Sequence, residues 1–318
     1  MYFHIFRRKK ISTKGIIVLG KLNNLVKPRL ILHVGTPKTG TTTLQFFLHQ
    51  YHQTLSDLGI LYPSAGIQPQ GNKPKHQWIV NDLLSGDETR FLANQKLLLA
   101  ELSSHLHIHM VVLSVEGIYN RWWDFSDAAK SLLSKMGQFF EVTVWVVFRE
   151  PLSFAQSLYG QAVKNPKSPR FPFCGTSDPL EMVIDDPSFS RNLRYADFVR
   201  SVESLFGSPV VLATKYEAAD IIDQAMGILG IDQRIGQPLE KKNLSLSEIG
   251  LEMARRINRL NIDSIERERY IDTIRELDGL IGKEDNEHQA SDEVKSRVHE
   301  LAKESREYLK GRYNIAWD

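Results

Sequence analysis

The chain has 318 residues, of which 42% are hydrophobic and 25% are charged, and its formal net charge is +2. This composition is typical of globular proteins, and the single cysteine, Cys174, excludes an internal disulfide framework. No apolar run approaches the roughly 18 residues that a membrane-spanning helix needs. We therefore expect an intracellular, cytoplasmic protein.

Basic residues are concentrated at the start of the chain. Residues 1–30 contain eight Lys or Arg and no acidic residue, which leaves 32 basic against 38 acidic residues in the rest. We expect residues 1–28 to be a basic extension and residues 29–318 to form the main domain. The extension is either a solvated tail or an arm in peripheral contact with an anionic membrane.

The main domain begins with a short apolar run, Leu30–Val34, which is typical of a buried strand. A loop with two glycines follows it. Apolar residues then recur at spacings of three and four, which predicts an amphipathic helix that ends at Gly59. They are Leu44, Phe47, Leu48, Tyr51, Leu55 and Leu58. A strand, a glycine loop and a helix in this order are typical of a phosphate-binding site.

The glycine loop departs from the pattern of nucleotide triphosphatases. Its spacing, Gly35-x4-Gly40, is that of a P-loop, in which Lys and then Ser or Thr directly follow the second glycine. Here Thr41 follows Gly40, and Lys38 lies two residues before it. Main-chain N–H groups and a helix N-terminus can still bind an anion. The usual lysine contact to the β- and γ-phosphates beside Mg²⁺ is lost.

Strand and helix patterns alternate along the next part of the chain. Strands are predicted at 110–114, 141–148 and 210–214, and helices at about 91–105 and 191–206. This alternation predicts an α/β domain with a mostly parallel sheet flanked by helices. The loops at one edge of such a sheet would hold a nucleotide. Residues 165–190, which are rich in proline, are expected to form a long functional loop.

From about residue 244 the chain is expected to be helical. A capping box, Ser245-x-x-Glu248, begins the first of three helices. Their expected apolar stripes are Ile249, Met253, Ile257 and Leu260; Ile271, Ile274, Leu277 and Ile281; and Val294, Val298, Leu301 and Tyr308.

A second strand-to-helix junction follows the strand 141–148. Arg149 stands at its end, Pro151 suits the first turn of a helix, and Ser157 lies eight residues past Arg149. Together with Pro37-Lys38-Thr39-Gly40-Thr41-Thr42, this pair resembles the motifs of sulfotransferases that use 3′-phosphoadenosine 5′-phosphosulfate (PAPS). In that family the loop binds the 5′-phosphosulfate, and the Arg and Ser bind the 3′-phosphate. The resemblance covers roughly residues 30–260 and implies a P-loop-like sulfotransferase fold.

The resemblance also implies a role for the displaced lysine. Sulfuryl transfer moves a neutral SO₃ unit from a phosphosulfate to a hydroxyl or amine, and negative charge builds on the leaving phosphate oxygen. Lys38 would bond that bridging oxygen. No metal is required for a single 5′-phosphate, and the family in general works without one. The remaining residues of the 5′-phosphate loop would be Pro37, Thr39, Gly40, Thr41, Thr42 and Thr43.

Members of the family also close over the 3′-phosphate with a basic loop late in the chain. The best candidates here are Lys241 and Lys242, although Asn243 follows them where the family has glycine. The alternative is a simple surface cluster of lysines.

An acceptor hydroxyl needs a general base, for which sulfotransferases use His or Glu. Two residues fit: His76, in the segment after Leu61-Tyr62-Pro63, and Glu116, just after the strand 110–114. Alternatively, His76 is a surface histidine among lysines and Glu116 holds a loop. The run His105-x-His107-x-His109 is interpreted as a solvated or half-buried edge rather than a metal site.

The sequence therefore favours a PAPS-dependent sulfotransferase that acts on a carbohydrate or another small acceptor, with no nucleic-acid partner. One alternative is a P-loop-like nucleotide kinase, which is disfavoured because no Mg²⁺-binding Asp is evident at the end of a core strand. The other is a non-catalytic protein that binds a nucleotide or a polyanion.

Overall fold

The computed structural model describes residues 27–67, 74–169, 171–207, 210–217, 221–232, 234–236, 246–281 and 290–317. Residues 1–26, which make up nearly all of the expected basic extension, lie outside these ranges, as do Lys241 and Lys242. The domain already includes Lys27 and Pro28. The Lys27 ammonium donates to the Gly137 carbonyl at 2.8 Å, and the Pro28 carbonyl accepts from the Glu141 N–H at 3.0 Å.

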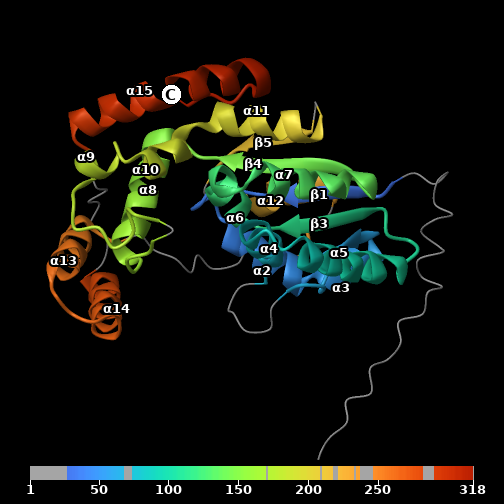
Figure 1. The fold of residues 1–318 in the computed structure, drawn as a ribbon, viewed down its shortest axis with the longest axis horizontal. Coiled ribbons are helices and arrows are strands. Elements are labelled where there is room, and N and C mark those ends of the chain that lie inside the picture. The colour runs from blue at the N-terminus through green and yellow to red at the C-terminus, as the bar shows by residue number, and fades with distance from the viewer. Residues whose placement is uncertain are drawn as a thin grey trace, which may run out of the picture.

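Among the described residues, five parallel strands form one sheet in the order β2-β3-β1-β4-β5 (Figure 1). They are β1 (Arg29–His33), β2 (Ile60–Leu61), β3 (Met110–Ser114), β4 (Glu141–Phe148) and β5 (Val211–Lys215). The four predicted strands and the parallel sheet are confirmed. β2 was not predicted, because two residues are too few to show a period.

Both faces of the sheet are apolar, since side chains alternate between them along each strand. Ile31, Val112 and Val147 belong to the core on one face, which is covered by α2 (Thr41–Gln50), α3 (His52–Asp57) and α12 (Ile221–Leu229). Leu30, Val111 and Val146 belong to the larger core on the other face. The helices that contribute to this second core include α4 (Trp78–Ser85), α5 (Glu88–Ser103), α6 (Gly117–Arg121), α7 (Asp127–Ser134) and α11 (Tyr195–Phe206).

The remaining helices gather near the carboxyl ends of the strands (Figure 1). α8 (Pro151–Lys164) follows β4 and contacts both α15 (Asp292–Tyr313) and α13 (Glu248–Arg259). α15 also packs along α11, and α13 packs on α14 (Ser264–Ile281). The long loop expected at 165–190 contains two short helices, α9 (Leu180–Val183) and α10 (Pro187–Ser190).

The single helix expected between residues 44 and 58 is wrong. The chain forms α2 and α3, which meet at Tyr51, where φ is −102° and ψ is 18°, outside the helical range. α3 ends at Asp57, so Leu58 is exposed rather than buried. Gly59 has φ of +80°, as expected for a glycine that ends a helical segment.

The expected apolar stripe of α13 is also wrong in part. Ile249, Met253 and Leu260 are exposed, and the helix is buried through Gly250, Leu251, Ala254 and Asn258. Small residues on that side permit close packing, and the Asn258 amide donates to the carbonyls of Val163 and Thr176 at 2.9 and 2.7 Å. The N-cap is Ser247, whose hydroxyl accepts from the Gly250 N–H; Ser245 lies outside the described residues.

The other two C-terminal helices follow their predicted stripes more closely. Ile271 and Ile274 of α14 are buried, and so are Val294 and Val298 of α15. Leu277 of α14 is exposed, and the side chain of Ile281 is not among those described.

Candidate functional site

The candidate site lies at the carboxyl edge of the sheet, between β1 and β4. From β1 the chain leads to β2 on one side of the sheet, and from β4 it leads to β5 on the other side. The loops after these two strands therefore diverge, and such a switch point is where open parallel sheets bind ligands. The predicted phosphate loop follows β1, and Arg149 follows β4. The topology thus brings the two predicted motifs to the same edge.

The loop between β1 and α2 is fixed by its own threonines. The Thr36 hydroxyl donates to the Val147 carbonyl of β4 at 2.8 Å, and the Thr39 hydroxyl donates to the Thr36 carbonyl at 2.6 Å. Both side chains are fully buried. Thr39 was expected to contact the phosphate, but its hydroxyl closes the loop, so its main-chain N–H is the group left for an anion.

Two residues of the loop have a left-handed backbone. Lys38 has φ of +66° and Gly40 has φ of +75°. A non-glycine residue in this region costs of order 1 kcal/mol or more, and such strain occurs most often at functional sites. A Cβ on Gly40 would also lie 3.1 Å from the Ile221 side chain, which would have to shift slightly, so the left-handed conformation is the main reason for a glycine here.

The N-terminus of α2 is open to a ligand. Gly40 is its N-cap and provides no side chain to accept from the N–H groups of the first turn. The Thr41 side chain is only 2% exposed, and its hydroxyl oxygen has no hydrogen-bond partner among the described residues. Thr42 and Thr43 follow it in the same turn and are partly exposed. An anion at this position would satisfy both the N–H groups and the hydroxyl.

Arg149 lies directly against the phosphate loop. Its Nη1 donates to the Lys38 carbonyl at 3.2 Å, and its Nε donates to the Ser153 hydroxyl at 2.8 Å. The guanidinium carbon lies 5.5 Å from the centre of the Tyr216 ring, which directly follows β5. A cation and an aromatic face therefore adjoin the loop, which is a pairing that suits a phosphate and a base.

Ser157 lies one turn beyond Ser153 on α8 and is half-buried. Residues four apart share a face of a helix, so Ser157 faces the same way as the serine that contacts Arg149. Ser157 was predicted from its distance along the chain from Arg149, whereas the contacts of Arg149 with Ser153 and Tyr216 were not predicted. Tyr216 had no sequence signal other than its place directly after a strand.

The geometry argues against His76 as a general base. The imidazole is fully buried: its Nε2 donates to the Pro63 carbonyl at 3.0 Å, and its Nδ1 accepts from the Ser114 N–H at 3.2 Å. Burial lowers the pKa of His76 to about 4. With both ring nitrogens bonded to the main chain, neither can take a proton from an acceptor. His76 therefore has a structural role: it holds its own segment against the main chain. The alternative interpretation of His76 as a surface histidine is also wrong, because the side chain is buried.

Glu116 remains at the right edge of the sheet. It lies two residues beyond Ser114, and Gly35 lies two residues beyond His33, the partner of Ser114 in the β1–β3 register. The Val115 N–H donates to the His33 carbonyl at 2.9 Å and fixes this alignment. Glu116 is partly exposed at the start of α6. Its carboxylate is therefore the predicted base that keeps access to solvent beside the loop.

A buried polar cluster behind the loop was not predicted. His33, Ser114 and Gln45 are all fully buried, and the Ser114 hydroxyl lies 2.9 Å from His33 Nδ1 and 3.2 Å from Gln45 Nε2. The available signal was a histidine and a serine at the ends of two apolar strands, together with a glutamine directly after Leu44 on the apolar side of a helix.

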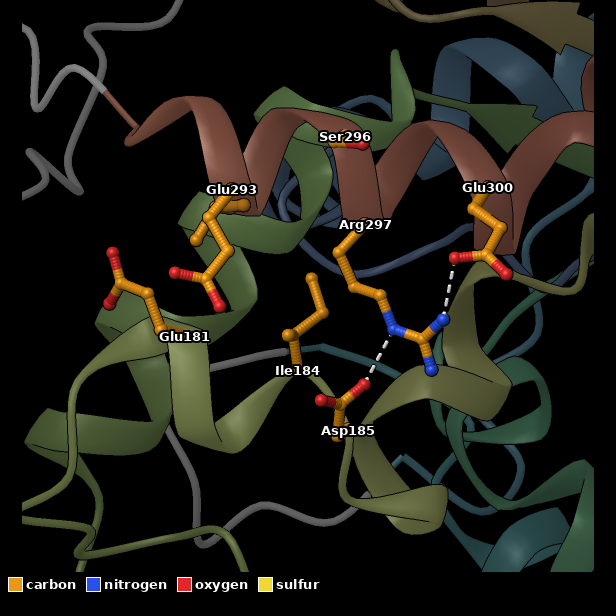
Figure 2. A pocket seen from close by; sticks show the side chains of 8 residues that line it. Glu181, Ile184, Asp185, Glu293, Ser296, Arg297 and Glu300 are labelled. Atoms are coloured by element: carbon orange, nitrogen blue, oxygen red, sulfur yellow. Dashed lines mark hydrogen bonds and ion pairs between the residues drawn. The ribbon is translucent and has the colours of Figure 1, made fainter.

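Other polar groups lie elsewhere. A depression between α9 and α15 is lined by Glu181, Asp185, Glu293 and Glu300. Figure 2 shows Arg297 between two of these carboxylates, with its nitrogens 2.6 Å from Asp185 and 2.7 Å from Glu300. The depression is thus lined by four carboxylates and by one arginine that is already paired with two of them. Its negative charge does not suit the binding of an anion.

The histidine run 105–109 lies before β3, at the opposite edge of the sheet from the phosphate loop. His107 bonds the Ser56 carbonyl at 2.8 Å through its Nε2. Within the described part of the chain, no three His, Cys, Asp or Glu side chains meet as a metal-binding group. None of the described helices is both long enough and apolar enough to cross a membrane.

Comparison with known proteins gives no relative. No protein-family model matches the chain, and no curated protein or solved structure is significantly similar to it.

Proposed function

We propose that this protein is a PAPS-dependent sulfotransferase whose acceptor is a carbohydrate or another small hydroxylated molecule. The observation that supports the proposal is the contact between the two motifs: Arg149 donates to the carbonyl of Lys38. The expected 3′-phosphate clamp would therefore adjoin the expected 5′-phosphate loop. A ligand with phosphates on both sides of one ribose fits that pairing. A triphosphate chain fits it less well, because the lysine precedes the second glycine.

The residues present suit the nucleotide. The Thr41 hydroxyl is buried and has no partner among the described residues, and α2 begins without a side-chain cap. The hydroxyl and the first N–H groups of α2 could therefore all donate to a bound anion. Gly35 is needed here, because a Cβ on it would lie 2.9 Å from the Thr41 hydroxyl oxygen. Bound PAPS would supply an activated sulfuryl group. The Arg149 guanidinium and Ser157 would hold the 3′-phosphate, and the Tyr216 ring would provide a face for the adenine.

Catalysis would then rest on position and charge. The N–H groups at the start of α2 would hold the 5′-phosphate, and the Lys38 ammonium would neutralise charge on the bridging oxygen as its bond to sulfur breaks. Glu116 would accept the proton of the acceptor hydroxyl as the new S–O bond forms, and 3′,5′-ADP would be the leaving group. His76 keeps the segment that contains it anchored to β3 and takes no proton.

Nucleotide titration tests the proposal. By isothermal titration calorimetry without Mg²⁺, we expect 3′,5′-ADP to bind far more tightly than ATP, because only 3′,5′-ADP carries a phosphate at the 3′ position as well as at the 5′ position. ATP measured with Mg²⁺ serves as the matched titration. Binding of ATP that requires Mg²⁺, with none of 3′,5′-ADP, would contradict the proposal and favour a kinase.

A further inference from the structure

Four buried polar side chains from three elements meet behind the phosphate loop. His33 ends β1, Ser114 ends β3, and Thr41 and Gln45 lie one turn apart on α2. The first two and Gln45 are 0% exposed, and Thr41 is 2% exposed. Three of their polar atoms have no partner among the described residues: His33 Nε2, Gln45 Oε1 and Thr41 Oγ1. Buried polar atoms are rarely left unpaired, so this cluster requires an explanation.

The Ser114 hydroxyl connects Gln45 with His33. The Gln45 amide donates to the hydroxyl oxygen, and the hydroxyl also contacts His33 Nδ1. A hydroxyl can donate to an imidazole nitrogen or accept from it; when Ser114 donates to Nδ1, the neutral imidazole carries its own proton on Nε2. Burial favours this neutral form, since it lowers the pKa of His33 to about 3. In that tautomer, Nε2 is a donor without an acceptor.

Two of the unpartnered atoms lie close to each other beside Gly35. A Cβ on Gly35 would lie 2.9 Å from His33 Nε2 and 2.9 Å from Thr41 Oγ1, so these two atoms are at most twice that distance apart. One water molecule can bridge such a gap with two hydrogen bonds of ordinary length. Gln45 lies four residues after Thr41 and therefore on the same face of α2. Buried water molecules typically make about three hydrogen bonds to groups of this kind.

We propose that His33 is a positioning residue that aims the Thr41 hydroxyl at the bound phosphate through one buried water molecule. The water accepts from His33 Nε2–H and donates to Gln45 Oε1 and to Thr41 Oγ1. Because the lone pair of Thr41 is then occupied, its own proton points out of the loop, toward a phosphate oxygen at the N-terminus of α2. The inference rests on the proposed function, because it requires a 5′-phosphate in this loop.

Two substitutions of His33 separate this role from a structural one. His33→Gln keeps an N–H near the position of Nε2, whereas His33→Asn keeps a polar group near Nδ1 for Ser114 and loses the donor to the water. The readout is the ratio of the affinities for 3′,5′-ADP and adenosine 3′-monophosphate, measured by calorimetry. We expect His33→Asn to lower this ratio about tenfold, the value of one hydrogen bond to a charged group, and His33→Gln to keep it within about twofold.

Thr41→Val provides the second half of a double-mutant cycle. It should lower the same ratio, and His33→Asn should have no further effect in its background, because both changes break one chain of hydrogen bonds.

Gln45→Met, which leaves His33 in place, should also lower the ratio and covers the case in which His33→Asn does not fold. Ser305→Ala, on α15, is the control. It removes buried hydrogen bonds with the Ala196 N–H and the Leu193 carbonyl and should leave the ratio unchanged.

The outcomes are distinct. An unchanged ratio in His33→Asn and Gln45→Met, full additivity with Thr41→Val, or an equal loss in His33→Gln and His33→Asn would each overturn the positioning role alone. A parental protein that binds both nucleotides equally would refute the proposed function and, with it, this inference.

Discussion

At the scale of single residues, Lys38 combines strain and function. Its backbone is left-handed, with φ of +66°, and the resemblance assigns it to the leaving oxygen. Lys38→Ala should lower turnover much more than the affinity for 3′,5′-ADP, because the contact strengthens in the transition state. Lys38→Gly should lower turnover equally while it relieves the strain.

Stability distinguishes the two Lys38 variants. We expect the free energy of unfolding of Lys38→Gly to exceed that of Lys38→Ala by about 1 kcal/mol, measured by urea denaturation. The opposite order would show that the left-handed backbone at Lys38 is not strained.

The two buried histidines predict an acid-sensitive fold. The pKa of His33 is lowered to about 3 and that of His76 to about 4, both by burial, whereas an unfolded histidine has a pKa near 6.5. Below about pH 6.5 the unfolded chain therefore binds more protons than the folded protein. Stability is at its full value above that pH and falls as the pH decreases, by up to about 1.4 kcal/mol per pH unit for each histidine.

Urea denaturation between pH 7 and 5.5, where most carboxylates stay ionised, measures this slope. His76→Gln should remove the contribution of one histidine. An equal slope in the parental protein and in His76→Gln would contradict the burial of His76 as a neutral residue.

At the scale of elements, polar contacts hold the helices around the site. Glu150 caps α8 by accepting from the Ser153 N–H at 2.7 Å, and its other oxygen pairs with Arg306 of α15. At the other end of α8, Arg267 of α14 donates to the carbonyls of Val163 and Asn165 at 3.0 and 2.8 Å. A cation at a helix C-terminus satisfies carbonyls that have no partner within the helix. The helix that begins beside Arg149 is therefore secured at both ends.

The elements also show where sequence patterns succeed. The strands were predicted because continuous apolar runs of five to eight residues are typical of a sheet covered on both faces. The face of α13 was predicted wrongly in part, because Ile249, Met253 and Leu260 are exposed. The side that is buried carries the small residues Gly250 and Ala254 together with Leu251 and Asn258. Periodicity counts apolar residues, whereas the packing here is decided by how closely two helices can approach.

At the scale of the whole molecule, the resemblance assigned the two motifs to one nucleotide, and the topology of the sheet accounts for their contact. Nothing in the spacing of residues 38 and 149 says that they touch; their contact follows from the adjacency of β1 and β4 in the sheet. His33, Ser114 and Gln45 escaped prediction for the same reason, since each is an isolated polar residue until the register aligns β1 with β3. His76 was misjudged because burial and main-chain partners cannot be read from a polar segment.

The central claim is that the loop after β1 and Arg149 form one site for a nucleotide with both 3′- and 5′-phosphates. Arg149→Ala tests it most directly, by calorimetry with 3′,5′-ADP and with 5′-AMP. We expect the variant to bind 3′,5′-ADP more weakly by about 1.5 to 3 kcal/mol and to lose clearly less affinity for 5′-AMP. The contact of Arg149 with the Lys38 carbonyl supports the loop for both nucleotides, whereas the 3′-phosphate contact exists for 3′,5′-ADP alone. Arg297→Ala, in the acidic depression of Figure 2, should change neither affinity. An unchanged affinity of Arg149→Ala for 3′,5′-ADP, or an equal loss for both nucleotides, would contradict the account.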